Sequence, residues 1–300
     1  MERPLISIVF CSISPERYKK CTDNIASTIG VPVEFVRIDN LEYKWPIAKA
    51  YNEGAKRASS DCLLFLHEDV EFEHHGWGKA LVEKLHEPTT GVVGFIGSRI
   101  LFDAIGPWCM SGSNYGHVIG VRDGIVEVMR YHEFSEKDSQ MFVHVAIVDG
   151  LGMAVRKDVW AEHPFDEAML TGFHCYDIDF SLTISMAGYR NYAYTFGIIH
   201  FSRGSYEEQW LATTYKMLVE KWSPKLPYGV DGSLKDIDVD GLSASLDYDH
   251  IFRFFRKGIS KSLARKMVHR YLRKCRHSRA YRSHMAVVCW RYLCKYAFKK

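Results

Sequence analysis

Short apolar runs alternate with amphipathic segments over the first third of this 300-residue chain. A continuous apolar run of about four to eight residues is typical of a buried strand, whereas a helix repeats its apolar positions roughly every three or four residues. The pattern predicts strands at 5–11, 33–39, 63–69 and 91–97, and helices at 14–29, 47–59 and 76–85. Strands that alternate with helices predict an α/β protein with a mostly parallel, doubly wound sheet.

The rest of the chain follows this rhythm less closely. Residues 98–145 are rich in glycine and aromatic side chains, which predicts a hairpin-bearing region. Further on, the pattern predicts a strand entering a helix at 147–160, a helix at 177–187, a strand at 191–199 and a helix at 206–222. Prolines and several Gly, Ser and Asp residues over 223–250 predict a linker or irregular wrap. We therefore expect an α/β domain over 1–222, a linker over 223–250 and a helical region over 251–300.

Charge separates the last fifty residues from the others. The net charge is only +3, but residues 251–300 carry sixteen Lys and Arg, and all 36 acidic residues precede them. An acidic body with a basic end indicates that this end meets an anionic surface. Its cationic residues alternate with apolar ones, so an amphipathic helix on an anionic membrane, a nucleic-acid or partner site, and a bundle with a solvated cationic face all remain open.

The cysteines and the apolar runs bear on location. Eight cysteines include no CxxC pair and no metal-type spacing, which favours free thiols in a reducing cytosol. The chain shows no secretory leader near its start and no run of about 18 apolar residues that would span a membrane. We therefore expect a cytoplasmic protein, peripheral on the inner face of the cell membrane if its basic end binds lipid.

Two acidic clusters carry the candidate chemistry. The apolar run at 63–66 ends in His67-Glu68-Asp69, and a second cluster holds Asp177 and Asp179. Carboxylates at the carboxyl end of a buried strand lie where α/β sheets bind ligands, and they suit hard divalent cations. A solvated turn explains the first cluster equally well. Helix capping explains the second, unless one carboxylate reaches an acceptor hydroxyl as a base.

Two further polar residues follow predicted strands. Asp39 ends the strand at 33–39, where it either contacts a base or ribose or caps a turn. His200 follows the apolar residues 196–199 and is either a metal or phosphate ligand or a locally hydrogen-bonded histidine.

In this order, the residues resemble the family-2-like glycosyltransferases of the GT-A fold over roughly 5–205. The resemblance runs through SIVFCS, Asp39, the AKAYNEG segment at 48–54, LLFLHEDV, VDGLGMAVRKDVW with PFDE, and YDIDFSL. It implies a GT-A domain followed by the basic helical extension, and transfer of a sugar from a nucleotide donor with Mn²⁺ or Mg²⁺, inverting the anomeric centre.

The resemblance also implies roles for particular residues. The donor site would hold Ser12, Asp39, Asn52, Glu68 and Asp69, with a UDP-sugar as the expected donor. Asp69, His200 and Glu68 would bind the metal ion. Asp177 would deprotonate the acceptor hydroxyl, with Asp179 in reserve.

Two positions depart from the family pattern. His67 stands where the first Asp of Asp-x-Asp is usual, which removes a carboxylate from the metal site. Tyr176 stands where the Glu of Glu-Asp is usual, which leaves the base to Asp177. These departures keep open a catalytically degenerate domain that acts as a binding or scaffold module.

The expected task is transfer of one sugar to a glycan or lipid-linked acceptor in cell-surface polysaccharide synthesis. A nucleotidyltransferase is a rival, although the loop at 12–17 lacks the glycines that such an enzyme would use around a phosphate. No nucleic-acid partner is expected, because the body of the chain is acidic.

Overall fold

The computed structural model describes residues 3–122, 125–131, 141–202 and 207–297. The chain forms two compact units. The N-terminal unit contains Met1–Ile100, Gly112–Gly204 and Gly229–Ser233. The C-terminal unit contains Leu101–Ser111, Ser205–Tyr228 and Leu234–Lys300. The short strands β7 (Ile100–Leu101) and β15 (Tyr228–Gly229) lie where the chain passes between the units.

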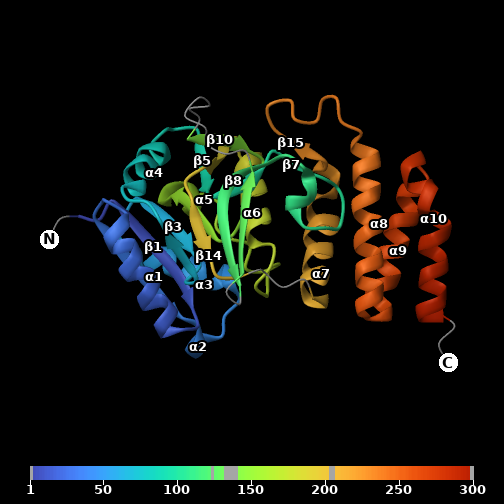
Figure 1. The fold of residues 1–300 in the computed structure, drawn as a ribbon, viewed down its shortest axis with the longest axis horizontal. Coiled ribbons are helices and arrows are strands. Elements are labelled where there is room, and N and C mark those ends of the chain that lie inside the picture. Colours follow the sequence, from blue (N-terminus) through green and yellow to red (C-terminus); the bar gives the residue numbers. More distant parts are fainter. Residues whose placement is uncertain (1–2, 123–124, 132–140, 203–206, 298–300) are drawn as a thin grey trace. The chain divides into compact units, whose positions relative to one another are not determined.

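A seven-stranded sheet forms the centre of the N-terminal unit (Figure 1). Its strands are, in spatial order, β10 (Phe142–Val145), β13 (Arg190–Tyr194), β5 (Thr90–Gly94), β12 (Gly152–Arg156), β3 (Cys62–Leu66), β1 (Ile6–Ser12) and β2 (Val33–Asp39). Every residue of β3 and β5 is buried, as expected for continuous apolar runs. The predicted α/β fold class is therefore confirmed.

The sheet is mixed rather than mostly parallel. β1 pairs in parallel with both β2 and β3, but β12 is antiparallel to both β3 and β5. This strand comes from the segment at 147–160, which returns to the sheet after a long excursion. Its direction depends on that excursion and has no local sequence signature.

A second sheet holds the strands of the excursion. Its order is β11 (Ile147–Val148), β6 (Ile96–Ser98), β8 (Asn114–Arg122), β14 (Ile198–His200) and β4 (Val70–Phe72), with β9 (Ile125–Tyr131) paired to β8. β8 and β9 are antiparallel neighbours in sequence, which confirms the predicted hairpin. The single strand predicted at 91–97 is instead two strands in two sheets, β5 and β6, separated by Phe95.

Helices flank the sheets of the N-terminal unit (Figure 1). They are α1 (Pro15–Thr28), α2 (Asn40–Tyr43), α3 (Ile47–Arg57), α4 (Trp77–Leu85), α5 (Lys157–Glu162) and α6 (Tyr176–Met186). The Ser14 hydroxyl accepts a hydrogen bond from the Arg17 amide, and Pro15 supplies a preset first turn, so α1 begins directly after β1.

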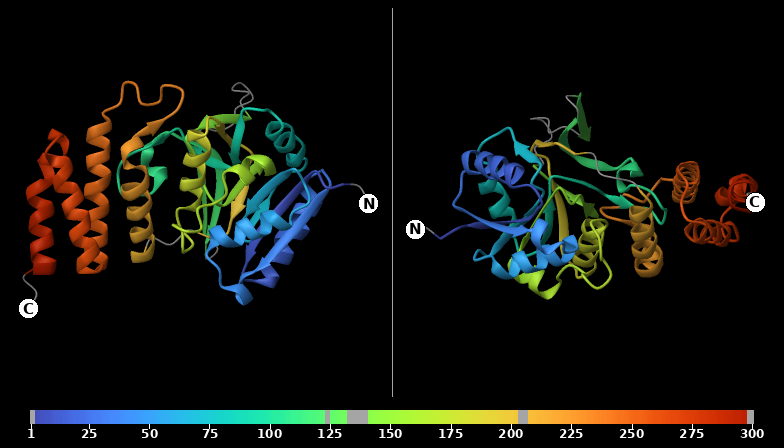
Figure 2. Two further views of the ribbon diagram at one scale, coloured as in Figure 1. Left: turned by 180° about the vertical axis from the view of Figure 1, so that it is seen from behind. Right: turned by 90° about the horizontal axis from the view of Figure 1, so that it is seen from below.

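The C-terminal unit is helical. Its regular elements are η1 (Trp108–Ser111), α7 (Glu208–Tyr215), η2 (Lys216–Trp222), η3 (Ser223–Lys225), α8 (Val239–Lys257), α9 (Lys261–Cys275), α10 (Arg279–Tyr292) and η4 (Leu293–Ala297). α8, α9 and α10 run side by side in all views (Figures 1 and 2). Their core includes Leu211 and Tyr215 of α7 together with Phe254, Met267 and Tyr271.

The predicted linker over 223–250 is therefore wrong from Val239 onward. The Asp238 side chain accepts a hydrogen bond from the Gly241 amide and starts α8, which runs through residue 250 to Lys257. The helical region also begins earlier than residue 251, because α7 packs its apolar side into the same core.

The structure also bears on the predictions about the cysteines and about membrane-spanning segments. All eight cysteines are free thiols. No helix among the described residues is long and apolar enough to cross a membrane.

Candidate functional site

Three side chains of the N-terminal unit come together in the geometry of a metal centre. One ligand atom each from His67, Asp69 and His200 lies within 4.8 Å of the others. His67 Nδ1 is 3.8 Å and His200 Nε2 is 3.4 Å from Asp69 Oδ1. Two imidazoles and a carboxylate are a donor set that transition-metal ions accept, with other positions left open.

Strand pairing brings these residues together from distant parts of the chain. β3 ends at Leu66, so His67 and Asp69 lie in the link to β4 rather than within a strand. β14 runs antiparallel to β4 and pairs His200 with Val70. The Phe201 amide then donates to the Asp69 carbonyl oxygen at 2.9 Å, which closes the corner. The site therefore forms only when β14 pairs with β4, which brings His200 beside Asp69.

Tyr176 fixes the orientation of His67. Its hydroxyl donates to the Gly150 carbonyl oxygen at 3.0 Å and lies 2.8 Å from His67 Nε2. Because the phenol has a single proton and gives it to Gly150, His67 Nε2 must be the protonated nitrogen. The lone pair of His67 Nδ1 is then free to face Asp69. An outer hydrogen bond that sets tautomer and ring orientation is typical of metal-binding histidines.

The charges of the cluster support one another. Burial and the neighbouring His200 lower the pKa of His67, so this imidazole is neutral at pH 7. Burial acts to raise the pKa of Asp69, but the two imidazoles outweigh it and leave this pKa below its usual value. Burial acts to lower the pKa of His200, and Asp69 outweighs it and raises that pKa. Asp69 is thus the anionic centre of the group.

The residues present fit a divalent cation. His200 Nε2 is buried and makes no hydrogen bond within the described residues, although it lies at ion-pair distance from Asp69. A buried polar atom without a hydrogen-bond partner costs free energy, and a bound metal ion would remove that cost.

The loop at 149–151 joins this cluster to the second acidic residue. The Gly150 amide donates to Asp177 Oδ2 at 3.1 Å, and the His67 amide donates to the Leu151 carbonyl oxygen at 3.0 Å. A side chain at position 150 would overlap the Tyr176 hydroxyl, so glycine is needed there. One short loop therefore holds the candidate base and the candidate metal ligands in register.

Asp177 has the electrostatics of a general base. It lies in the first turn of α6, and burial together with the charge of Asp149 raises its pKa to about 7. A base is most effective when its pKa lies near the working pH. Asp179, the predicted reserve, is 2% exposed. A carboxylate that deeply buried does not meet an acceptor hydroxyl, so the structure does not support that role.

The predicted donor-binding residues divide into two groups. Asp39 is partly exposed at the end of β2, where Oδ1 caps α2 through the Leu41 amide at 3.2 Å and Oδ2 lies 3.4 Å from Arg37. Ser12 is fully buried and accepts a hydrogen bond from Arg37 Nε at 3.0 Å. The geometry thus leaves Asp39 available to a ligand but does not leave Ser12 available.

Asn52 has a structural role instead of the predicted one. It is buried, its amide nitrogen donates to the Phe165 carbonyl oxygen, and its oxygen accepts from Trp160 Nε1 and the Phe165 amide. These bonds tie α3 to α5 and to the segment after it. The partner residues lie more than a hundred positions from Asn52, so no local sequence pattern predicts these bonds.

Glu68 does not join the metal cluster, contrary to prediction. Its Oε1 accepts hydrogen bonds from the Ile13 and Ser14 amides at 3.1 and 2.9 Å, which holds the loop after β1. A pocket of about 230 Å³ opens beside it and Asp69, lined also by Arg17, Lys20 and Phe201. The pocket sets two cationic side chains beside the cluster.

Sequence reasoning missed His67 and Tyr176 as contributors. Both were interpreted as losses from the family pattern, yet each contacts the other across 109 positions. The signal that could have found them is that both residues depart from the family pattern together. A histidine that replaces a carboxylate as a metal ligand needs an orienting partner, and Tyr176 supplies it.

The solved structures that resemble the chain include two glycosyl-transferring proteins. One is the crystal structure of GalNAc-T7 with UDP, GalNAc and Mn²⁺, at 10% identity and a TM-score of 0.48; the match covers 71% of this chain and 48% of that protein, so the chain spans about half its length. The other is mannosyltransferase PcManGT from Pyrobaculum calidifontis in complex with GDP-Man and Mn²⁺, at 12% identity and a TM-score of 0.46, covering 100% of this chain and 88% of that one. Neither likeness bears on the substrate of this chain.

The family comparison is decisive. No curated protein matches the chain. The model of a glycosyltransferase-like family, however, matches residues 7–218, which include all three metal-cluster residues and Asp177. The chain therefore belongs to this glycosyltransferase-like family, as its sequence motifs had indicated.

Proposed function

We propose that the chain is a metal-dependent, inverting transferase that moves a sugar from a nucleoside diphosphate sugar to a hydroxyl group. The observation that carries the proposal is the His67, Asp69 and His200 cluster, held by the loop at 149–151 beside Asp177. A cation held by the cluster would supply the positive charge that a diphosphate leaving group needs, and Asp177 offers the base that a hydroxyl nucleophile needs.

His67, Asp69 and His200 would hold the ion. Two imidazole donors favour Mn²⁺ over Mg²⁺, because Mg²⁺ prefers oxygen ligands and keeps its waters. When bound, the ion would neutralise charge on the departing diphosphate. Arg17 and Lys20, which line the neighbouring pocket, would add cationic contacts to the same group.

Asp177 would act on the acceptor. Its carboxylate takes the hydroxyl proton while the acceptor oxygen bonds to the anomeric carbon. The bond from that carbon to the diphosphate oxygen breaks, and its electron pair leaves with the nucleoside diphosphate. A single displacement of this kind inverts the anomeric configuration. Asp39 would contact the donor base or ribose, with UDP-sugars the first donors to test.

Turnover of a panel of UDP- and GDP-sugars, with the product's anomeric configuration read by NMR, tests the proposal. Transfer or slow hydrolysis that needs Mn²⁺ and stops in EDTA supports it. Retained configuration would refute the inverting step. Failure with every donor would favour the degenerate scaffold instead.

The pH dependence of transfer should report Asp177. Because the base must be unprotonated, we expect kcat/KM to fall about tenfold per pH unit below the pKa of Asp177, which is about 7 without a metal ion, and to level off above it. A dication bound nearby would favour the charged carboxylate, so it would move this acid limb of the pH profile to lower pH. Asp177→Asn should lower kcat roughly 10²- to 10⁴-fold and abolish the limb. Asp61→Asn, at an exposed carboxylate of the same unit, should leave both unchanged. An unaltered limb in Asp177→Asn would assign the base elsewhere.

The acceptor belongs to the proposal as well. We propose a glycan or lipid-linked acceptor of cell-surface polysaccharide synthesis, met at an anionic membrane surface. The support lies in the C-terminal unit, where Val287, Trp290 and Leu293 are 40%, 62% and 38% exposed along α10 and η4. They repeat at helical spacing and belong to residues 251–300, which contain sixteen Lys and Arg and no acidic residue. An exposed apolar face among cations is typical of a helix that lies in a membrane interface.

Trp290→Ala should weaken binding to anionic vesicles about tenfold, because a large apolar ring no longer enters the interface. Co-sedimentation with vesicles containing phosphatidylserine measures the effect. Met110→Ala, at a 54% exposed apolar residue of the same unit, is the matched control and should bind normally. Equal binding by the Trp290 variant and wild type would remove the membrane from the proposal.

A further inference from the structure

The C-terminal unit contains a pocket of its own. It has a volume of about 550 Å³, and all its lining residues belong to that unit. One part of the lining is basic, with Arg273, Arg276 and His277 at the end of α9 and beyond. Another part is apolar, with Val219 and Leu226. Nothing in the sugar-transfer site described above uses this pocket.

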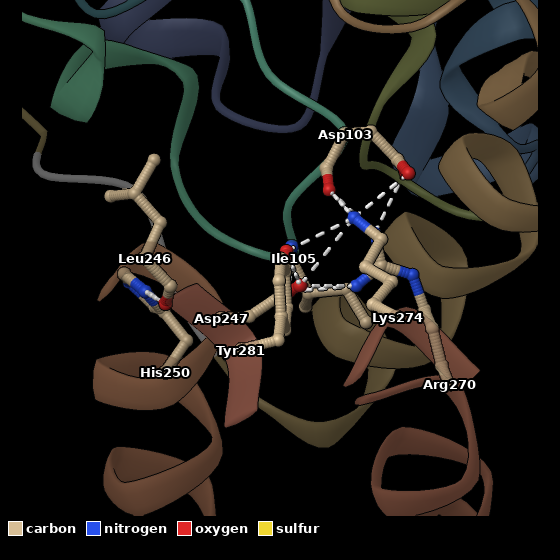
Figure 3. A network of polar contacts seen from close by, with 8 residues as sticks. All are labelled: Asp103, Ile105, Leu246, Asp247, His250, Arg270, Lys274 and Tyr281. Carbon is tan, nitrogen blue, oxygen red and sulfur yellow. Dashed lines mark hydrogen bonds and ion pairs between the residues drawn. The ribbon is translucent and has the colours of Figure 1, made fainter. Parts of the chain in front are cut away.

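A buried network of hydrogen bonds and ion pairs forms one wall of the pocket (Figure 3). It includes two further cationic residues of the lining, Arg270 and Lys274. Arg270 donates to both oxygens of Asp247 at 2.8 and 2.6 Å and to Asp103 Oδ1 at 2.8 Å. Lys274 pairs with Asp103 at 2.8 Å, and Tyr281 donates to Asp247 at 2.7 Å. These two cations and two carboxylates neutralise one another, so the charge of this wall is satisfied.

The other basic side chains of the lining have no such partner. Arg273, Arg276 and His277 are exposed and form no ion pair within the part of the chain that the structure describes. Asp240, an exposed residue in the first turn of α8, is the carboxylate on the pocket lining that opposes them. Two guanidinium groups against one carboxylate leave an excess of positive charge facing the pocket.

Ser278 supplies a second, independent observation. It is the N-cap residue of the 14-residue helix α10 and lines the pocket, and its side chain is 7% exposed. Its hydroxyl caps no backbone amide of the helix and has no hydrogen-bond partner within the described residues. A buried hydroxyl without a partner is costly, and the first amides of a helix are ready anion donors.

We propose that this pocket binds the phosphate or diphosphate group of an organic ligand. Arg273 and Arg276 suit phosphate oxygens because guanidinium groups make paired, charge-assisted hydrogen bonds. The Ser278 hydroxyl and the first turn of α10 complete the donor set. Val219 and Leu226 give the carbon part of the ligand an apolar wall. The phosphate belongs either to a lipid headgroup or to a soluble phosphorylated compound.

Pyrophosphate is the probe. Calorimetric titration into the full chain in EDTA should show saturable binding, because no metal ion is required here. We expect Arg273→Gln with Arg276→Gln to weaken it roughly 30-fold or more, and Ser278→Ala about three- to tenfold without lowering the melting temperature. Arg265→Gln, at an exposed arginine of the same helix that does not line the pocket, should bind as wild type does.

Several outcomes would overturn the proposal. They are no binding by the wild type, an equal loss in the Arg265 variant, and a Ser278 variant that melts earlier yet binds normally, which would make that hydroxyl a plain helix cap. Competition by phosphatidic acid vesicles but not by phosphatidylglycerol vesicles would identify a lipid phosphomonoester as the source. Competition by soluble sugar phosphates alone would identify a soluble ligand. Asp69→Ala should retain pyrophosphate binding, so this inference and the proposed function fail independently.

Discussion

Asp69→Ala is expected to lower sugar transfer by at least roughly 10³-fold. The carboxylate is the only anionic ligand of the cluster, and without it two neutral imidazoles hold a dication poorly. Metal stabilisation of a leaving diphosphate contributes several kcal/mol, which corresponds to a loss of that size. Steady-state rates at saturating donor measure it.

A graded variant separates metal binding from catalysis. Tyr176→Phe removes the hydroxyl that orients His67 and keeps the ring, so metal affinity should fall about 10- to 100-fold. Saturating Mn²⁺ should restore most of kcat, which a folding defect would not allow. Asp23→Ala, at an exposed carboxylate of the same unit, is the matched control. Full activity of Asp69→Ala in EDTA would contradict the metal site altogether.

Asp247→Ala is expected to destabilise the C-terminal unit by about 3 kcal/mol. This carboxylate is 1% exposed and accepts hydrogen bonds from Arg270, Tyr281 and the Ile105 amide. Its removal leaves a buried guanidinium whose remaining partner among the described residues is Asp103, and broken buried pairs of this kind cost about 3–5 kcal/mol. Urea unfolding followed by circular dichroism should show the loss in the helical signal.

The pH dependence of this effect has a definite sign. Burial acts to raise the pKa of Asp247, but Arg270 and Lys274 outweigh it and hold that pKa below its usual value. The stability that Asp247 contributes is therefore complete above about pH 4 and is lost as the pH falls through the folded pKa. The difference in the free energy of unfolding between the wild type and Asp247→Ala should therefore become smaller in acid. Asp249→Ala, at an exposed position of α8, should cost less than about 0.5 kcal/mol; a cost equal to that of Asp247→Ala would contradict the network.

Local pattern was sufficient for most strands and helices. The apolar runs at β1, β2 and β3 and the capping chemistry at Ser14 are short-range signals, and they predicted both the elements and the α/β class. The direction of β12 and the division of residues 91–97 between two sheets depend on partners far along the chain. The start of α8 was hidden because glycine and aspartate residues mask its apolar positions.

The residues of the candidate site show the same division between short-range signals and distant partners. Asp69 follows a strand, His200 ends one and Asp177 lies in the first turn of a helix, and sequence reasoning selected all three. Burial decided against Ser12, Asn52 and Asp179, and no single-sequence pattern reports which polar residue the fold will enclose. The contact between His67 and Tyr176 exists only in three dimensions, so two apparent defects in the motifs proved to be one arrangement.

Melting temperature against a panel of nucleoside diphosphates, with Mn²⁺ and with EDTA, tests the central claim most directly. A ligand that binds only the folded protein must raise its melting temperature. We predict that one nucleotide raises it in Mn²⁺ but not in EDTA, and that Asp69→Ala abolishes the increase while the melting temperature of the free variant stays near that of the wild type. A nucleotide-induced increase that persists in EDTA, or that Asp69→Ala leaves intact, would contradict a donor site built on His67, Asp69 and His200.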